Sequence, residues 1–256
     1  TAWARERVAG GGAPAIIRIV KGANMEMERV DASLHGWPLA TYRDKLDTDA
    51  NYHRMLDYGM QPENLAAVRL GIASHNLFTL AYGLVLAARA GVVDRVQFEM
   101  LEGMANHQRR ALFELTQNML LYAPACRQED FINAIGYLVR RLDENTGDEN
   151  FLRHAFSLEV DSPEWKDLEQ TFLASFGLME SVSAEPRRRQ NRLEGSVDGG
   201  QLSVEGSGAN IRFRNEPDID WSLPANGKWA QGIVERWQSR CGDDAAEVPL
   251  VVAGEE

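Results

Sequence analysis

Residues 15–20 read Ala-Ile-Ile-Arg-Ile-Val, a run in which four of the six residues are β-branched. β-Branched residues favour strands, and a short apolar run of this kind is typical of a strand buried in a parallel sheet. Gly22 follows the run and allows a tight exit from the strand. The one charged residue in the run, Arg18, requires a counter-charge from elsewhere, because a buried charge without a partner is very costly.

Three further strands are expected along the chain, and helical periodicity separates them. The expected strands are 67–73, 96–101 and 119–123, and the expected helices are 25–34, 48–58, 76–90, 106–117 and 131–144, with a helical extension at 150–158 and 163–176. Thr48 is the expected N-cap of the second helix, and Gly91 the C-cap of the third. Four β-then-α units in succession predict an α/β fold with a parallel sheet and right-handed crossovers.

Two architectures fit such units, a (β/α) barrel and a doubly wound sheet. A dinucleotide-binding fold would place Gly-x-Gly-x-x-Gly after a strand, and no strand here is followed by it. The run Gly10-Gly11-Gly12 precedes a strand instead and reads as a turn. The sequence therefore favours a barrel, and four units are half of an eightfold one.

Composition excludes several classes of protein. At 44% hydrophobic, the 256 residues can build a core, and the net charge of −11 argues against a nucleic-acid partner. The run Arg187-Arg188-Arg189 is a local exception that we interpret as a solvated patch. The two cysteines, Cys126 and Cys241, lie far apart, which indicates a reducing cytoplasm without a disulfide framework. The five histidines show no short ligand spacing, so no metal site is expected.

The chain changes character after about residue 182. We expect a barrel domain at 1–182, a linker rich in Ser, Gly, Glu and Arg at 183–212, and the start of a second domain at 213–256, with a helix at 225–237. Residues 1–7 read like the interior of a helix, and residues 248–254 like the start of a strand. The sequence is therefore expected to be a piece of a longer polypeptide.

The predicted strands end in polar residues, where the ligand groups of a barrel cluster. Lys21 follows the first strand, Ser74-His75-Asn76 follow the second, Glu99 lies in the third, and Tyr122 ends the fourth. A site with several cations and neutral donors suits a carboxylated or phosphate-bearing ligand.

The helix 131–144 carries a cationic face. Tyr137, Arg140 and Arg141 share this face, with Glu144 one turn further on. Each guanidinium offers a planar fork that fits a carboxylate. The pattern alone leaves two readings open, a carboxylate-binding pair and a solvated basic turn closed by an ion pair. It also leaves open another anion-binding barrel enzyme, such as a lyase or metal hydrolase, and a non-catalytic half-barrel.

Five motifs together resemble the proline dehydrogenase family, in its order and spacing: Arg18-Ile-Val-Lys-Gly-Ala23, Ser74-His-Asn76, Phe98-Glu-Met-Leu-Glu-Gly-Met104, Leu121-Tyr-Ala-Pro124 and Tyr137-Leu-Val-Arg-Arg-Leu-Asp-Glu-Asn145. The tail from Phe213 onward is similar to the opening of the glutamate-semialdehyde dehydrogenase domain found in the bifunctional bacterial members. The resemblance covers nearly the whole chain. It implies the C-terminal half of a (β/α)8 TIM-like barrel, a linker and the start of an aldehyde dehydrogenase domain.

The resemblance also implies an activity, the FAD-dependent oxidation of L-proline to Δ1-pyrroline-5-carboxylate, with electrons passing to a membrane quinone. The implied FAD contacts are Arg18 near flavin N5, with Val20, Lys21, Gly22, Ala23, Thr48, Ser74, His75, Asn76 and Glu144. The implied proline contacts are Arg140 and Arg141 on the carboxylate, with Tyr122, Tyr137 and Leu101 on the ring. NAD would serve the incomplete second domain. The protein would be a cytoplasmic homo-oligomer that associates peripherally with the membrane when reduced.

The sequence departs from the family pattern in three ways. Asn24-Met25 stand where many relatives have Tyr-Trp, the family's upstream half is absent, and Cys241 falls too early to be the nucleophile of the second domain. We therefore expect the isolated chain to bind FAD weakly or not at all and to be inactive alone.

Overall fold

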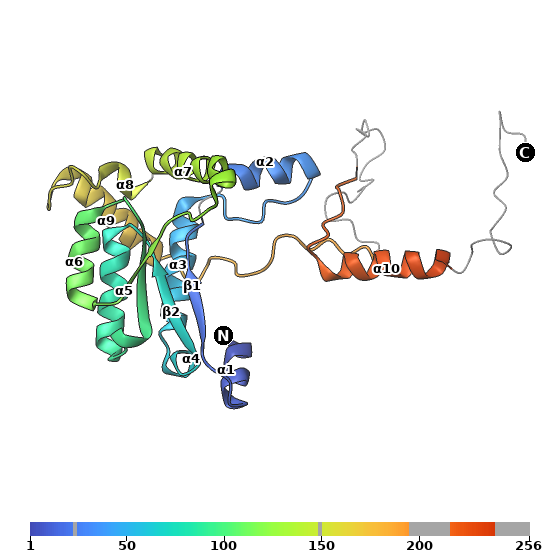
Figure 1. Cartoon of the computed structure of the whole chain (residues 1–256), viewed down its shortest axis with the longest axis horizontal. Helices are drawn as coiled ribbons and strands as arrows, with labels where there is room; N and C mark the ends of the chain where they lie inside the picture. Colours follow the sequence, from blue (N-terminus) through green and yellow to red (C-terminus); the bar gives the residue numbers. More distant parts are fainter. Residues whose placement is uncertain (23–24, 148–149, 195–215, 239–256) are drawn as a thin grey trace, which may run out of the picture. The chain divides into compact units, whose positions relative to one another are not determined.

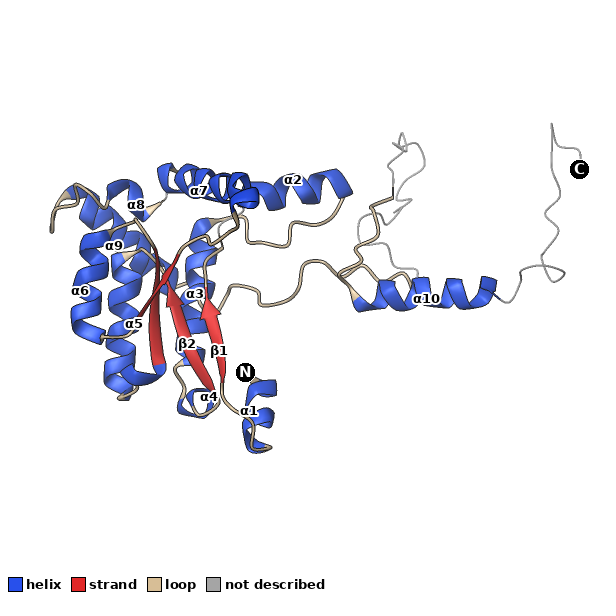
Figure 2. Ribbon diagram, viewed as in Figure 1, coloured by secondary structure: helices blue, strands red, loops and turns tan. Residues whose placement is uncertain are grey.

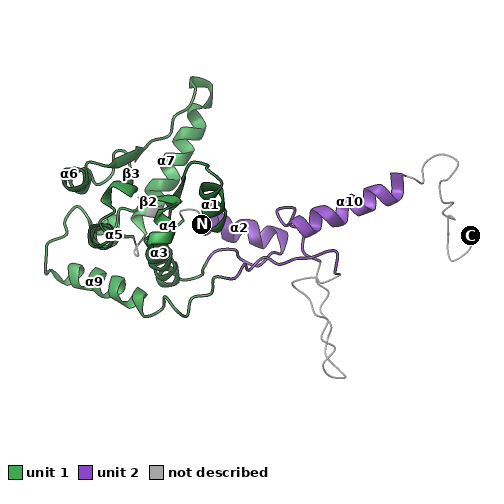
Figure 3. Ribbon diagram, turned by 90° about the horizontal axis from the view of Figure 1, so that it is seen from below, with its two compact units in different colours: residues 1–24, 42–184 green, residues 25–41, 185–256 purple. Residues whose placement is uncertain are grey.

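A computed structural model describes residues 1–22, 25–147, 150–194 and 216–238, except for the side chain of Glu144 (Figure 1). The chain forms two compact units, of residues 1–24 with 42–184 and of residues 25–41 with 185–256 (Figure 3). Ala23, Asn24, Phe213, Cys241 and the strand expected at 248–254 lie outside the described residues.

The first unit is built on a four-stranded parallel sheet (Figure 2). The strands are β1 (Ala15–Ile19), β2 (Val68–Ala73), β3 (Val96–Leu101) and β4 (Met119–Tyr122), and they pair in the order β1-β2-β3-β4. The predicted α/β fold with a parallel sheet is confirmed. The strand order follows the chain order, as in a barrel, whereas a doubly wound sheet reverses direction at a switch point.

Helices cover one face of this sheet. The core joins Ile72 of β2 and Phe98 of β3 to Tyr52 and Leu56 of α3 (Lys45–Gly59), and includes residues of α5 (Leu77–Ala90) and α6 (Asn106–Thr116). Gly91 caps α5 with a φ of 67°, as its sequence position predicts. The other elements of this unit are α1 (Ala2–Ala9), α4 (Pro62–Leu65), the 3-10 turns η1 (Val93–Arg95) and η2 (Gln128–Asp130), α7 (Phe131–Thr146), α8 (Phe151–His154) and α9 (Pro163–Phe176).

Two of the helix boundaries predicted from the sequence are wrong: the start of α3 and the end of the helix expected at 150–158. Helix α3 begins at Lys45 with Asp44 as its N-cap, so Thr48 is an interior residue. The Thr48 hydroxyl donates to the Asp44 carbonyl at 3.2 Å, one turn back, and this bond is compatible with a continuing helix. The helix expected at 150–158 is a single short turn, α8, which Asn150 caps by accepting from the Leu152 N–H.

The second unit contains α2 (Met25–His35) and α10 (Pro224–Gln238), both predicted from the sequence. The interpretation of Arg187–Arg189 as a solvated patch is wrong for its central residue. Arg188 lies over the Trp37 ring at 4.7 Å, and its guanidinium is 3.8 Å from the Asp220 carboxylate. Buried Asn226 donates to the Gln190 side chain at 2.9 Å. Within the described ranges, no helix is long and apolar enough to cross a membrane.

Candidate functional site

The face of the sheet away from the helical core carries an ion pair between two strands. Arg18 on β1 and Glu99 on β3 approach to 2.5 Å, and the Glu99 side chain is 4% exposed. Glu99 supplies the counter-charge expected for Arg18, but the expected burial of Arg18 is wrong: its side chain is 39% exposed, and the buried member of the pair is the Glu99 carboxylate. Gly71 lies beneath it on β2, in register with Arg18. A Cβ atom at Gly71 would lie 2.1 Å from Glu99 Oε1, so the pair spans β2 only because residue 71 has no side chain.

Aromatic rings extend this ion pair toward α7. The Arg18 guanidinium lies 4.9 Å from the centroid of the Tyr122 ring at the end of β4. The Tyr122 and Tyr137 ring centroids are 6.3 Å apart, and the Arg141 guanidinium lies 5.1 Å from the Tyr137 centroid. Arg141 is 9% exposed. The structure thus forms one row from Glu99 through Arg18 and the two tyrosines to Arg141.

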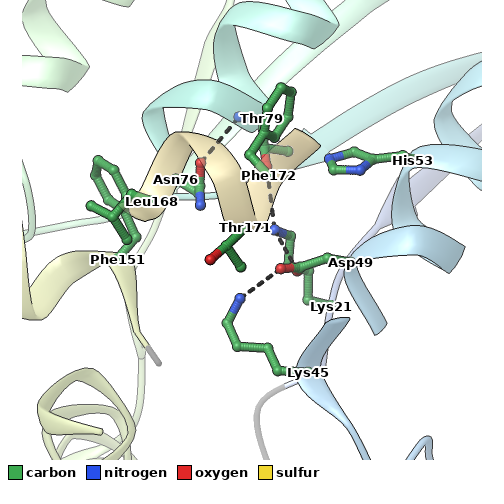
Figure 4. A pocket seen from close by; sticks show the side chains of 10 residues that line it. All are labelled: Lys21, Lys45, Asp49, His53, Asn76, Thr79, Phe151, Leu168, Thr171 and Phe172. Atoms are coloured by element: carbon green, nitrogen blue, oxygen red, sulfur yellow. Dashed lines mark hydrogen bonds and ion pairs between the residues drawn. The ribbon is translucent and has the colours of Figure 1, made fainter. Parts of the chain in front are cut away.

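A second polar cluster lies just beyond the end of β1 (Figure 4). Lys21 Nζ contacts Asp49 Oδ1 at 2.8 Å and Thr79 Oγ1 at 3.2 Å, and it lies over the Tyr52 ring at 5.3 Å. Lys45 Nζ contacts the other oxygen of Asp49 at 2.6 Å. The Asp49 carboxylate therefore lies between two ammonium groups.

Burial and charge oppose each other in this cluster. Burial raises the pKa of Asp49, but the charges of Lys21 and Lys45 outweigh it, and the pKa is held below its ordinary value. Burial lowers the pKa of Lys21, against the opposing effect of Asp49. Neighbouring His53 is buried, which lowers its pKa to about 4, so it is neutral at pH 7. The positive charge of the cluster therefore comes from the two lysines.

The segment Ser74-His75-Asn76 links β2 to α5. Asn76 caps α5 by accepting from the Thr79 N–H at 3.1 Å, and Ser74 Oγ accepts from the Asn76 N–H at 3.1 Å. His75 Nε2 accepts from the Leu101 N–H at 3.1 Å, and burial lowers the His75 pKa to about 4. The neutral ring therefore carries its proton on Nδ1. That buried Nδ1 has no hydrogen-bond partner among the residues described, so it is a donor suited to a ligand oxygen.

The structure brings together many of the predicted site residues. Arg18, Tyr122, Tyr137 and Arg141 form one row, and Leu101 pairs in register with Tyr122. The described residues show no ring contact, ion pair or hydrogen bond between the row and four other predicted residues: Arg140 and Val20 are exposed, Gly22 lies in open space with a φ of +92°, and the Thr48 hydroxyl bonds its own helix. Ala23 and the Glu144 side chain are not described. The roles assigned to all these residues stay predictions.

Sequence reasoning missed three residues of the arrangement. The role of Gly71 was visible in the sequence, since an isolated glycine inside a strand indicates that another group approaches the backbone closely. The contact between Lys45 and Asp49 was also visible in the sequence, because opposite charges four residues apart on a helix are neighbours. Their meeting with Lys21 depends on the packing of α3 beside β1, which the local pattern does not encode.

A family model described as "Proline dehydrogenase" matches residues 1–154. Proline dehydrogenase 2 of Bacillus subtilis (strain 168) is 30% identical over 129 residues, which cover 50% of this chain and 36% of the relative.

Two solved structures of proline utilization A (PutA) also align with the chain. The protein from Corynebacterium freiburgense has a TM-score of 0.68 and 37% identity, covering 90% of this chain and 20% of that one. The protein from Bdellovibrio bacteriovorus, inactivated by N-propargylglycine, has a TM-score of 0.70 and 26% identity, covering 100% of this chain and 23% of that one. The chain thus spans between 20% and 36% of the length of these proteins.

Proposed function

The chain belongs to the proline dehydrogenase family, and we propose that it supplies part of the site for FAD-dependent oxidation of L-proline to Δ1-pyrroline-5-carboxylate. The observation that carries this proposal is the row from Glu99 through Arg18, Tyr122 and Tyr137 to Arg141. It combines a fixed cation, two rings and a second cation on one side of the sheet. The carboxylate of proline can pair with a cation, and its saturated apolar ring can pack against aromatic side chains.

The residues present fit a flavin dinucleotide. The buried, unpaired Nδ1–H of His75 offers a donor to a cofactor oxygen. Lys21 and Lys45 supply positive charge for a phosphate-bearing ligand. FAD, when bound, would accept a hydride from the proline carbon next to the ring nitrogen. We assign Val20, Gly22, Ala23, Thr48, Ser74, Asn76 and Glu144 to the same cofactor region on the resemblance alone.

The protein's own groups would bind and orient the substrate. Arg141, with Arg140 beside it, would hold the proline carboxylate through charge-assisted hydrogen bonds. Tyr122, Tyr137 and Leu101 would enclose the apolar ring and exclude water. Arg18, held by Glu99, would keep a positive charge at a fixed position beside the reacting atoms. The chemistry therefore depends on positioning by residues from β1, β3, β4 and α7.

The wider context of this activity is also a proposal. Alignment with PutA over 90% to 100% of the chain supports a barrel domain at 1–182, a linker at 183–212 and the start of a second domain at 213–256. On this basis the second domain would oxidise glutamate semialdehyde with NAD. A membrane quinone would accept the electrons from the flavin. The whole protein would be a cytoplasmic homo-oligomer that associates with the membrane when reduced.

The test uses the longest natural polypeptide that contains this sequence. We expect a yellow flavin spectrum and proline-dependent reduction of a dye. Arg140→Ala and Arg141→Ala should each raise the KM for proline by about 10- to 100-fold, because each removes a charge-assisted hydrogen bond. FAD affinity should change little, because neither residue is assigned to the cofactor.

Arg127→Ala is the matched control, since Arg127 precedes α7 and its side chain is 84% exposed. It should leave both the KM and the FAD affinity unchanged. Wild-type KM in both Arg140→Ala and Arg141→Ala would contradict the carboxylate assignment. A colourless protein whose activity depends on a divalent ion would contradict the proposed function itself.

A further inference from the structure

We propose that Asp49 is a positioning residue that holds the ammonium groups of Lys21 and Lys45 in place for an anionic part of the cofactor, most simply its phosphates. The inference rests on the proposed function, because it concerns the same cofactor. Asp49 itself would not touch the cofactor. It would act through the two lysines that bind its two carboxylate oxygens.

The geometry of the three side chains supports this role. Each Asp49 oxygen has its own lysine, at 2.8 Å from Lys21 and 2.6 Å from Lys45. An ammonium group has three N–H donors. Within the described part of the chain, Lys21 donates one hydrogen bond to Thr79 and forms an ion pair with Asp49 Oδ1, and Lys45 donates one hydrogen bond to Asp49 Oδ2. At least one donor of Lys21 and two of Lys45 therefore remain for a ligand.

The surroundings make this arrangement rigid. The Asp49 side chain is 5% exposed, and the Lys21 ammonium is also fixed by Thr79 on α5 and by the Tyr52 ring. Both lysines and Asp49 line a cavity of about 20 Å³, as does Asn76 (Figure 4). That volume holds about one water molecule or one phosphate oxygen. The cavity is thus suited to the end of an anionic group rather than to a whole cofactor.

A purely electrostatic account gives the opposite expectation. Asp49 cancels one of the two lysine charges next to the cavity. If only net charge mattered, removing the carboxylate would strengthen the binding of an anion. If Asp49 positions the lysines, removing it weakens binding even though the site becomes more positive. The two accounts therefore predict opposite changes in cofactor affinity when the Asp49 carboxylate is removed.

The experiment measures the FAD dissociation constant of the longest natural polypeptide, by titration of the cofactor-free protein. Asp49→Asn should raise this constant at least about tenfold, which is the effect of losing one charge-assisted hydrogen bond. Asp49→Glu keeps the net charge and moves the carboxylate by one methylene, so it should also weaken binding. Asp47→Asn is the matched control, because it makes the same charge change on the same helix and should alter the constant by less than about twofold.

A second measurement follows Lys21 without the cofactor. The rate at which an amine-acylating reagent labels Lys21, read by mass spectrometry, should rise in Asp49→Asn and stay unchanged in Asp47→Asn. Equal or tighter FAD binding by both Asp49 variants would overturn the positioning role while leaving the proposed function intact. A wild-type protein that binds no FAD would overturn the proposed function and this inference with it.

Discussion

The two sides of the candidate site are held in place differently. At the ends of β1 and β2, polar side chains are fixed by partners from other elements: Lys21 by Asp49 and Thr79, and His75 by the Leu101 N–H. On α7, the arginines belong to a helix whose large apolar side chains are exposed: Phe131, Ile132, Ile135, Leu138, Val139 and Leu142.

Among the residues that the structure describes, Tyr137 and Asn145 of α7 contact residues at the ends of the strands. Tyr137 meets Tyr122, and the Asn145 side chain donates to the Met104 sulfur at 3.2 Å. The strand ends are ordered by buried tertiary contacts, whereas α7 depends more on its own helical hydrogen bonds. The comparison teaches that the proposed cofactor side is preorganised by this chain to a greater degree than the proposed substrate side.

The largest expected effect is at Gly71. Gly71→Ala places a Cβ atom 2.1 Å from Glu99 Oε1, which must displace the carboxylate from Arg18. Crowding the interior and breaking the ion pair should lower the free energy of unfolding by about 3 kcal/mol. Urea denaturation measures this loss in the free energy of unfolding, provided that wild type and variant have the same m-value.

Gly136→Ala is the matched control on α7. Its Cβ meets nothing within 4 Å, and replacing a helical glycine with alanine should stabilise the protein by about 0.5–1 kcal/mol. A Gly71→Ala protein as stable as wild type would show that Glu99 can move freely, and that the strand ends are no better ordered than α7.

An intermediate effect is expected from pH at His75. Its pKa is lowered to about 4 in the folded protein, against about 6.5 in an unfolded chain. Between pH 6.5 and pH 4 the unfolded state binds more protons than the folded state. The contribution of neutral His75 to the free energy of unfolding is therefore fully present above pH 6.5 and is lost as the pH falls toward 4. From His75 alone, the free energy of unfolding should be about 1–2 kcal/mol lower at pH 5 than at pH 7.

His75→Gln isolates this contribution, because the amide cannot titrate. The difference between wild type and variant is measured by urea denaturation at both pH values. His53, whose pKa is also lowered to about 4, is present in both proteins and cancels. Equal pH dependence in the two proteins would show that His75 is not buried in its neutral form.

The smallest effect is expected on the outer surface of α7. Ile132 is 76% exposed, so Ile132→Ala in the chain as given should change the free energy of unfolding by less than about 0.5 kcal/mol. The same substitution at fully buried Ile72 of β2 should cost at least about 2 kcal/mol. Thermal and urea denaturation of the pair measure the contrast. A large loss in Ile132→Ala would mean that α7 is packed as firmly as the sheet.

Much of the fold follows from local sequence. The runs at 15–20 and 67–73 contain strands because their apolar residues alternate onto the helical core. The end of α5 follows from Gly91, which adopts a left-handed conformation without a steric penalty. The sequence also predicts an ion pair for Arg18, but for the wrong reason: the Arg18 side chain is 39% exposed, and the buried charge that needs a partner is Glu99.

The rest depends on register and packing. Glu99 reaches Arg18 because β2 lies between their strands with glycine at the crossing point, and that alignment is set by the whole sheet. Thr48 was expected to cap α3 because threonine is common at that position. The helix begins at Lys45 instead, which places Lys45 and Asp49 one turn apart and next to Lys21.

The spatial order of the strands is also the order in which they leave the ribosome. β2 pairs with β1 and β3 with β2, so a neighbour of each new strand has already been synthesised. Arg18 differs, because its carboxylate partner is on β3 and arrives only after β2 has been made. The charge proposed to lie beside the flavin therefore obtains its partner only when the third strand is in place, so the site and the sheet are completed by the same strand.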